Sequence, residues 1–433
     1  MAEKEPPQLT RRRTFIKQAL AASVGSAMLP SHAKSLVLEG GLTLYFPESA
    51  DYKRLNTPYN SDLSFKPLAI AACRNEADVV AAVKYAKEKK LKPSIKSGGH
   101  SFVGASFNDG GLIIDVSQMK QKIYLAKTDT FIAGPGLKLA EVYDYLLANG
   151  RLLPSGACGG VGLSGLTLGG GYGFFARQHG LTCDFLNHVR MVNAEGEVIT
   201  SGEIRKILWA CRGGGNGHFG VITSMQFSTV KAPARLTTQK FRAHNLTPKR
   251  AAQLMKGWFK IASQLPNPMF SAFILNGKSL TMVISSTYSH TGPAFQKAKK
   301  ALLELGTKTR GKYSKATATV VKTYSGRTNP LPFRNLSAGY YNGFADIENI
   351  AEQVCKETIE HPGIIFQINT VGGAISEVDK KSTAYAHRLY QFLGELQAYW
   401  QSEGQRKKIM PGVDKIRKLL DRIPHHYANY PDP

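Results

Sequence analysis

Short apolar runs alternate along the chain with stretches in which apolar residues recur at helical spacing, which predicts mixed α and β structure. In the first half, apolar runs predict strands at Leu68–Ala72, Pro93–Lys96, Leu112–Val116 and Phe131–Ala133. Asn75 follows the first run as a candidate helix cap, and Val79, Val83 and Ala86 then recur at helical spacing. A further amphipathic helix is expected to end at Gly150.

From about residue 233 the pattern changes, because glycine becomes rarer and the helical stretches become longer. Helical spacing extends over Pro248–Leu265 and Gly292–Leu305. Strand-like stretches lie at Phe270–Ser286, Ile364–Thr370 and Phe392–Trp400. The 433 residues are enough for two domains with separate cores. We therefore expect an α+β fold with a first domain at 36–232 and a second at 233–420.

The first 33 residues have the order of a twin-arginine export signal. The run Arg11-Arg12-Arg13-Thr14-Phe15-Ile16-Lys17 is followed by a weakly apolar stretch, Ala19 to Leu29, and by small residues in Ser31-His32-Ala33. That stretch is shorter than the about 20 residues that cross a bilayer, and no other run could span a membrane. We expect export through the twin-arginine translocon and a mature chain that is periplasmic or secreted.

The chain is strongly basic, with 56 Lys and Arg against 31 Asp and Glu and a net charge of +25. Without the first 33 residues, which hold five cations and two anions, the charge is +22. The cations are scattered and match no RNA-binding or zinc-finger signature, so no specific nucleic-acid partner is expected. An anionic polymer would still be attracted by such a field.

The five cysteines are an odd number, so at least one is expected to be free: Cys73, Cys158, Cys183, Cys211 and Cys355. They contain no C-x-x-C spacing, and neither a zinc site nor any other metal site is predicted. Cys158 stands out because it lies inside a glycine-rich loop.

Three glycine-dense segments suggest a loop system for an extended ligand such as a dinucleotide. They are Ser97-Gly98-Gly99-His100-Ser101, the stretch from Gly156 to Gly173, and Arg212 to Gly220. Glycine lets backbone amides converge on a phosphate and permits positive φ angles. The third segment formally matches G-x-G-x-x-G, but no βαβ start precedes it and Lys240 stands where a ribose-binding acid is required. NAD binding is therefore rejected.

The first domain resembles that of the berberine bridge enzyme-like flavoproteins, with their PCMH-type FAD-binding domain. The likeness rests on Ser97–Ser101, on Leu168–Gly173 and on Trp209–Thr223, and covers about residues 60–230. It implies FAD bound covalently through His100, with Cys158 as the candidate for a second link, in a loop where the family's C-P-T-V-G reads Cys-Gly-Gly-Val-Gly here. The cofactor-binding residues implied by the resemblance are His100, Cys158, Ser97, Gly98, Gly99, Ser101, Val161, Gly162, Gly170, Gly171, Gly173, Gly220, Val221 and Asn429.

In the second domain the resemblance rests on Asn369-Thr370-Val371-Gly372-Gly373, Tyr385-Ala386-His387-Arg388 and Tyr427-Ala428-Asn429-Tyr430. Glu395 precedes Trp400 by five residues, the spacing of the family's catalytic base, on a strand of a sheet that would cover the flavin. The implied catalytic residues are Glu395 as base, Tyr427 as its helper and Asn369 as the group that orients the substrate. Because family members continue beyond this motif, residues 421–433 are expected to be a shortened return to the FAD domain.

The resemblance implies an FAD-dependent oxidoreductase that oxidises a hydroxyl or amine of a small molecule or sugar by hydride transfer to flavin N5. Valine at position 161 is typical of family members that use dioxygen and produce hydrogen peroxide. Two alternatives stay open: a flavin dehydrogenase with another electron acceptor, and a non-catalytic basic protein that binds an anionic polymer.

Overall fold

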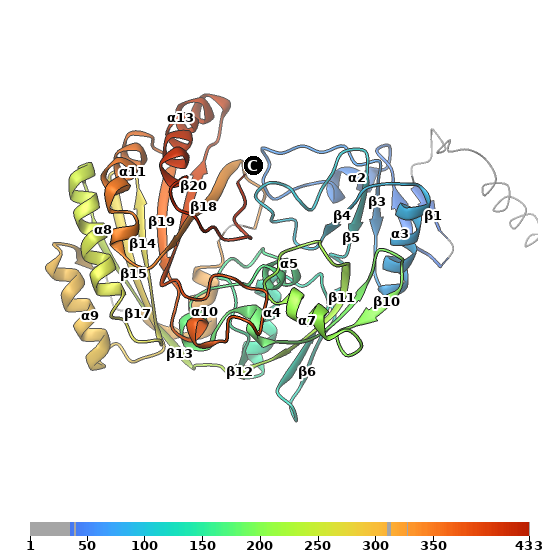
Figure 1. Cartoon of the computed structure of the whole chain (residues 1–433), viewed down its shortest axis with the longest axis horizontal. Helices are drawn as coiled ribbons and strands as arrows, with labels where there is room; N and C mark the ends of the chain where they lie inside the picture. The colour runs from blue at the N-terminus through green and yellow to red at the C-terminus, as the bar shows by residue number, and fades with distance from the viewer. Residues whose placement is uncertain (1–34, 39, 310–312, 327, 433) are drawn as a thin grey trace, which may run out of the picture.

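Two five-stranded β-sheets and one two-stranded sheet, built from the first half of the chain, form one lobe, and a larger antiparallel sheet forms the other (Figure 1). The computed structural model describes residues 35–432, except 39, 310–312 and 327. The predicted twin-arginine segment therefore lies outside the described residues. Within these residues no helix is both long and apolar enough to cross a membrane.

The first sheet combines an antiparallel edge with a parallel centre. Its strand order is β1-β2-β3-β5-β4, and β3, β5 and β4 run parallel to one another. The strands predicted from short apolar runs are confirmed here, and Asn75 caps α3 through its side chain as expected. The elements are β1 (Ser35–Val37), β2 (Thr43–Tyr45), α2 (Ala50–Leu55), β3 (Ala69–Ala72), α3 (Glu76–Glu88), β4 (Pro93–Lys96) and β5 (Leu112–Asp115).

The second sheet is antiparallel, in the order β10-β9-β11-β7-β6, and carries the second and third glycine segments in its connections. Its helices include α4, which ends before Gly150 as predicted. The elements are β6 (Lys122–Leu125), β7 (Thr130–Ala133), α4 (Leu139–Ala148), β8 (Arg151–Leu152), α5 (Leu163–Leu168), α6 (Ala176–His179), η1 (Thr182–Phe185), β9 (Leu186–Val192), β10 (Val198–Thr200), α7 (Arg205–Cys211), β11 (Val221–Ser228) and β12 (Val230–Lys231).

The large sheet has the order β16-β13-β15-β14-β19-β20-β18, with β17 also paired to β13. Its predicted strands and both long helices of the second half are confirmed. The elements are β13 (Arg235–Ala243), α8 (Pro248–Ala262), β14 (Met269–Asn276), β15 (Ser279–Ser286), α9 (Pro293–Glu304), β16 (Lys308–Thr309), β17 (Tyr313–Ala316), α10 (Thr317–Thr323), β18 (Phe333–Tyr341), η2 (Phe344–Asp346), α11 (Glu348–Glu360), β19 (Ile364–Thr370), α12 (Ala374–Glu377), β20 (Phe392–Tyr399) and α13 (Glu403–Leu420).

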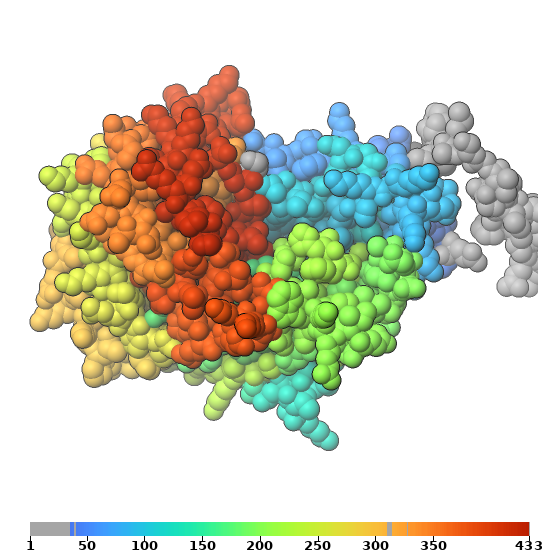
Figure 2. All heavy atoms as spheres, in the orientation of Figure 1, coloured from blue at the N-terminus to red at the C-terminus, as the bar shows by residue number. Residues whose placement is uncertain are grey.

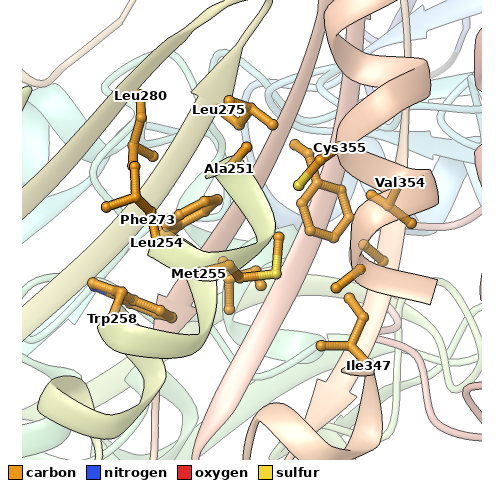
Figure 3. Close-up of a cluster of buried hydrophobic side chains, with 14 of the residues drawn as sticks. Ala251, Leu254, Met255, Trp258, Phe273, Leu275, Leu280, Ile347, Val354 and Cys355 are labelled. Atoms are coloured by element: carbon orange, nitrogen blue, oxygen red, sulfur yellow. The ribbon is translucent and has the colours of Figure 1, made fainter. Parts of the chain in front are cut away.

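One face of the large sheet packs against helices and forms the largest core of the molecule. Trp258 of α8 is fully buried with Phe273 of β14, and α11 adds Val354 and Cys355 (Figure 3). Burial of this apolar surface supplies the main stabilisation of the domain. Because side chains alternate along a strand, the residues between these core positions must point to the opposite face, toward the other lobe.

Buried polar contacts join the two lobes. Arg388, only 1% exposed, forms an ion pair at 2.6 Å with Asp184 of η1 and also donates to the Thr383 hydroxyl. Arg177 of α6 donates to main-chain carbonyls of the large-sheet domain, including that of Met269. The surface between the lobes is closed over much of its length in the view of Figure 2. The two lobes therefore form one continuous body around the loops that face each other.

Candidate active site

The strand β20 carries Glu395 on the face of the large sheet that looks away from the helices. Glu395, Gln397 and Tyr399 alternate with the core residues Leu396 and Ala398, as the strand period predicts. Strand pairing places Glu395 opposite Gln367 of β19 on one side and opposite Ser337 of β18 on the other. The carboxylate is therefore held by the centre of a sheet and is only 7% exposed.

Burial raises the pKa of Glu395 to about 7, while side-chain hydrogen bonds with Gln397 and Tyr430 pull it downward. Desolvation penalises the charged carboxylate, and hydrogen bonds that favour this form only partly compensate. A carboxyl group whose pKa is close to neutral pH is suited to exchange protons.

Asn369 is linked to Glu395 by hydrogen bonds through two tyrosines, Tyr172 and Tyr430. The Asn369 Nδ2 donates to the Tyr172 hydroxyl at 3.1 Å, and Tyr172 and Tyr430 share a hydrogen bond of 2.8 Å between their hydroxyl groups. Gln367 in turn donates to Asn369 Oδ1. Glu395 and Asn369, both predicted from the sequence, thus belong to one hydrogen-bonded group.

Tyr427 contacts the second glycine segment. Its hydroxyl accepts from the Gly171 amide at 2.9 Å and from Asn429 Nδ2 at 3.0 Å, and burial raises its pKa to about 12. The hydroxyl that bonds to Glu395 belongs to Tyr430, three residues further on. The sequence assigned no role to Tyr430, although it ends the same Tyr-Ala-Asn-Tyr motif.

Asn429 ties the C-terminal segment to two glycine segments. Its Nδ2 also donates to the Leu166 carbonyl, and its Oδ1 accepts from Asn216 at 3.0 Å. These bonds place Asn429 between α5 and the Arg212–Gly220 segment.

His100 lies in the first glycine loop, after β4. Its ring stacks on Tyr59 with 3.7 Å between the ring centres, and a Cβ added to Gly160 would lie 2.7 Å from His100 Nε2. Burial, with the nearby charge of Lys138, lowers the pKa of His100 to about 4. The imidazole is therefore neutral at neutral pH and has an unprotonated ring nitrogen.

Cys158 is half-buried in the second loop, and its side chain accepts hydrogen bonds from the Gly160 and Val161 amides. Burial outweighs these bonds and raises the pKa of the thiol, as does the charge of Glu395. Across the domain boundary, a Cβ on Gly326 would lie 3.5 Å from Cys158 Sγ. All five cysteines are free thiols.

The His100 and Cys158 loops touch backbone to backbone. A Cβ on Gly98 would come within 2.5 Å of the Gly162 nitrogen, so any larger residue would separate the loops. The Ser97 hydroxyl donates to the Pro135 carbonyl at 2.6 Å, and Ser101 accepts from the Ala105 amide. The structure therefore brings both predicted attachment residues to one place.

The remaining predicted glycines line the turns beside these loops. Gly171 has φ +83° and its amide bonds Tyr427, whereas Gly99, Gly170 and Gly220 also have positive φ. Gly173 is packed closely against the Ser155 carbonyl. Val221 begins β11, opposite Val192 of β9.

Two groups of backbone amides have no acceptor within the described part of the chain. They are the amides of residues 98–101 and of residues 216–219. Free amides in glycine-rich loops suit phosphate oxygens, and a neutral imidazole suits attachment of an electrophilic ring. The residues present therefore fit FAD. Within the described ranges no group of three His, Cys, Asp or Glu could hold a metal ion.

Comparisons with known proteins agree with this fit. Residues 67–202 match the FAD binding domain family. An uncharacterized FAD-linked oxidoreductase of Bacillus subtilis, YgaK, is 27% identical over 401 residues, which are 89% of this chain and 87% of that protein.

Two solved structures have the same fold over nearly the whole chain. Physcomitrella patens BBE-like 1 superposes with a TM-score of 0.84 at 22% identity, over 91% of this chain and 90% of the other. A chitooligosaccharide oxidase superposes with a TM-score of 0.80 at 26% identity, over 90% and 88%. The expected α+β fold with a PCMH-type FAD-binding domain is confirmed.

Proposed function

We propose that this chain, which is an FAD-linked oxidoreductase of the berberine bridge enzyme-like kind, oxidises a hydroxyl group of a carbohydrate. The observation that carries the proposal is Glu395, a buried carboxylate with a pKa of about 7 beside the His100 and Cys158 loops. The similarity to a chitooligosaccharide oxidase, 26% identical, supports a sugar as the substrate.

FAD, when bound, supplies the acceptor for a hydride at its flavin ring. The chain supplies the proton chemistry: ionised Glu395 takes the proton from the substrate hydroxyl as the hydride leaves carbon. Gln397 and Tyr430 hydrogen-bond the carboxylate and favour its ionised form. Asn369, linked through Tyr172 to Tyr430, is the residue that we propose orients the substrate.

We propose that His100 holds the flavin covalently and that Cys158 can provide a second link. His100 has the neutral ring nitrogen that such a bond requires. Cys158 lies in the loop that contacts His100, but its raised pKa makes the thiolate scarce. The histidine link is accordingly the stronger part of the proposal.

Dioxygen is the proposed electron acceptor, with hydrogen peroxide as the product. Support comes from Val161, which lies in the Cys158 loop that packs against the His100 loop, and from the oxidase name of the similar structure. A dehydrogenase would give the same reduced flavin but would react slowly with dioxygen.

We further propose that residues 1–33 direct export by the twin-arginine route. A reporter fusion in which Arg12 and Arg13 are exchanged for lysine would test this proposal.

The test combines a spectrum with rapid kinetics. Flavin absorbance that stays in the pellet after acid precipitation would support covalent FAD, and peptide mass spectrometry would locate it. Anaerobic mixing with oligosaccharides should bleach the flavin, and admitted dioxygen should restore its colour with peroxide formed. A purified yellow protein that no sugar bleaches would refute the carbohydrate proposal.

A further inference from the structure

The inner face of the large sheet continues well beyond Glu395. On each strand, the residues that alternate with the helix-packed core belong to this face. On β14 the core residues are Phe273 and Leu275, so Ile274 points inward. On β15 and β13 the same alternation turns Thr281 and Arg242 inward, next to the core residues Leu280, Met282 and Phe241.

Hydrogen-bonded register aligns these residues in one row across the sheet. Glu395 is opposite Gln367, Gln367 is opposite Ile274, Ile274 is opposite Thr281, and Thr281 is opposite Arg242. Directly opposed residues share a face. Four strand spacings separate the ends of the row, so Arg242 lies about 19 Å from Glu395.

The residues of this row beyond the carboxylate are all more accessible than Glu395. Glu395 is buried, Gln367, Ile274 and Thr281 are half-buried, and Arg242 is half-buried at the far end. Beyond it, Lys308 of β16 is opposite Arg242 and is exposed. The row is thus a strip of partly accessible sheet surface that begins at the proposed base and ends at cations.

The far end of the row is positively charged. Lys240 lies on the same strand and face as Arg242, and its Nζ is 5.2 Å from the centre of the Tyr324 ring. Among the ion pairs of the described residues, none involves Lys240, Arg242 or Lys308. Like charges kept together without a counter-charge raise the local concentration of anions.

We propose that Lys240, Arg242 and Lys308 form a remote anion subsite of the active site, and that the substrate is an acidic, carboxylated oligosaccharide. This inference rests on the carbohydrate oxidation proposed above. The reacting hydroxyl lies at Glu395, and the chain of sugar rings follows the row toward Arg242.

Each residue of the row has matching chemistry for such a chain. Gln367 and Thr281 present an amide and a hydroxyl to sugar hydroxyls, and Ile274 offers an apolar contact between them. The Arg242 guanidinium can bind a carboxylate through two parallel hydrogen bonds. Binding energy from a remote subsite can be used at the reacting centre.

The test uses matched substrates and a matched pair of variants. Cello-oligosaccharides would be compared with the same oligomers carboxylated at C6 of the non-reducing-end units, so that the reacting unit is identical. The variant is Arg242→Gln with Lys308→Gln, and the control is Arg205→Gln with Lys297→Gln, which removes the same charge from exposed helix positions outside the row. Flavin reduction and calorimetric binding would both be measured.

We expect the carboxylated oligomer to have the higher kcat/KM, in a salt-sensitive way. The double variant should lower the ratio of acidic to neutral kcat/KM about tenfold, the effect of losing roughly 1.4 kcal/mol of binding, whereas the control should keep it. A ratio that is unchanged in the variant, or no preference in the parent protein, would overturn the inference. If neither oligomer bleaches the flavin, variant-sensitive calorimetric binding would still support the subsite while the carbohydrate oxidation proposal fails. Absence of such binding as well would overturn both.

Discussion

The ring of Tyr59 lies nearly parallel to the imidazole of His100, with 3.7 Å between the ring centres and 18° between the planes. The main chain of Tyr59 holds this position, because its amide donates to the Gly99 carbonyl and its carbonyl accepts from the Leu331 amide. Tyr59 therefore fixes His100 from a segment that is distant in sequence and connects it to the second domain.

Replacing Tyr59 by alanine should reduce covalent attachment of the flavin, because the imidazole loses the surface that fixes its ring plane. We expect the fraction of FAD that survives acid precipitation to fall several-fold, while Tyr59→Phe retains it. Noncovalent FAD content, measured before precipitation, separates loss of attachment from loss of binding. An unchanged fraction in Tyr59→Ala would show that the stack has no role in attachment.

Replacing Glu395 by glutamine should slow flavin reduction by about 10² to 10⁴, the usual contribution of a general base. In the unmodified protein, the reduction rate should rise with pH through about 7, since only the ionised carboxylate accepts a proton. Anaerobic stopped-flow traces across pH measure both. A rate without pH dependence between 6 and 8 (about one unit on either side of that pKa) would contradict the assignment.

Replacing Tyr430 by phenylalanine should shift the pH profile of the flavin reduction rate to higher pH. The Tyr430 hydroxyl lowers the pKa of Glu395 through a hydrogen bond, so its loss raises that pKa and shifts the inflection to higher pH. Tyr427→Phe is the matched control, because the Tyr427 hydroxyl bonds Gly171 and Asn429. Equal shifts in both variants would mean that the two tyrosines act on Glu395 alike.

The same buried carboxylate should reduce stability as pH rises. The folded-state pKa of Glu395 lies above its ordinary value of 4.5. The contribution of this group to the free energy of unfolding is therefore fully present below pH 4.5 and is lost as pH rises through about 7. Full ionisation costs about 3 kcal/mol at this shift. Glu395→Gln should therefore raise the free energy of unfolding at pH 8 by up to that amount and leave it nearly unchanged at pH 4. Thermal denaturation at the two pH values provides the measurement.

The ion pair of Arg388 with Asp184 should dominate the coupling of the lobes. Asp184→Asn leaves a guanidinium that is 1% exposed without its counter-charge, which costs about 3 to 5 kcal/mol. The exposed pair of Asp51 with Arg54 is the control, and Asp51→Asn should cost less than about 1 kcal/mol. Chemical denaturation followed through flavin fluorescence would report both, and equal costs would contradict the proposed coupling.

Local patterns were sufficient for most of the fold. The apolar runs near Ile113 and the helical spacing around Val83 correspond to observed elements, because each pattern reflects burial of one face of a strand or helix. The part of the candidate site in the first domain could also be predicted from the sequence, because its glycines are clustered there. In the second domain, the alternation of Glu395 and Gln397 was enough to predict their common face.

Contacts between distant segments could not be predicted in this way. Tyr59 and His100 are 41 residues apart, and the hydrogen bond of Tyr427 with Gly171 joins residues 256 apart. No periodicity encodes which of two tyrosines in one motif meets a carboxylate on another strand. The row from Glu395 to Arg242 likewise depends on sheet order and register, which local patterns leave undetermined.

The return of residues 427–430 to the glycine loops has a consequence for the order of biosynthesis. The Tyr427 hydroxyl and the Asn429 amide complete a wall whose other parts, Gly171 and Leu166, are translated more than 250 residues earlier. The loops can form while the ribosome is still making the second domain, but this side of the proposed FAD site stays incomplete until residues 427–430 emerge. Stable cofactor loading should therefore follow translation of that segment and, if the chain is exported in the folded state, precede its passage across the membrane.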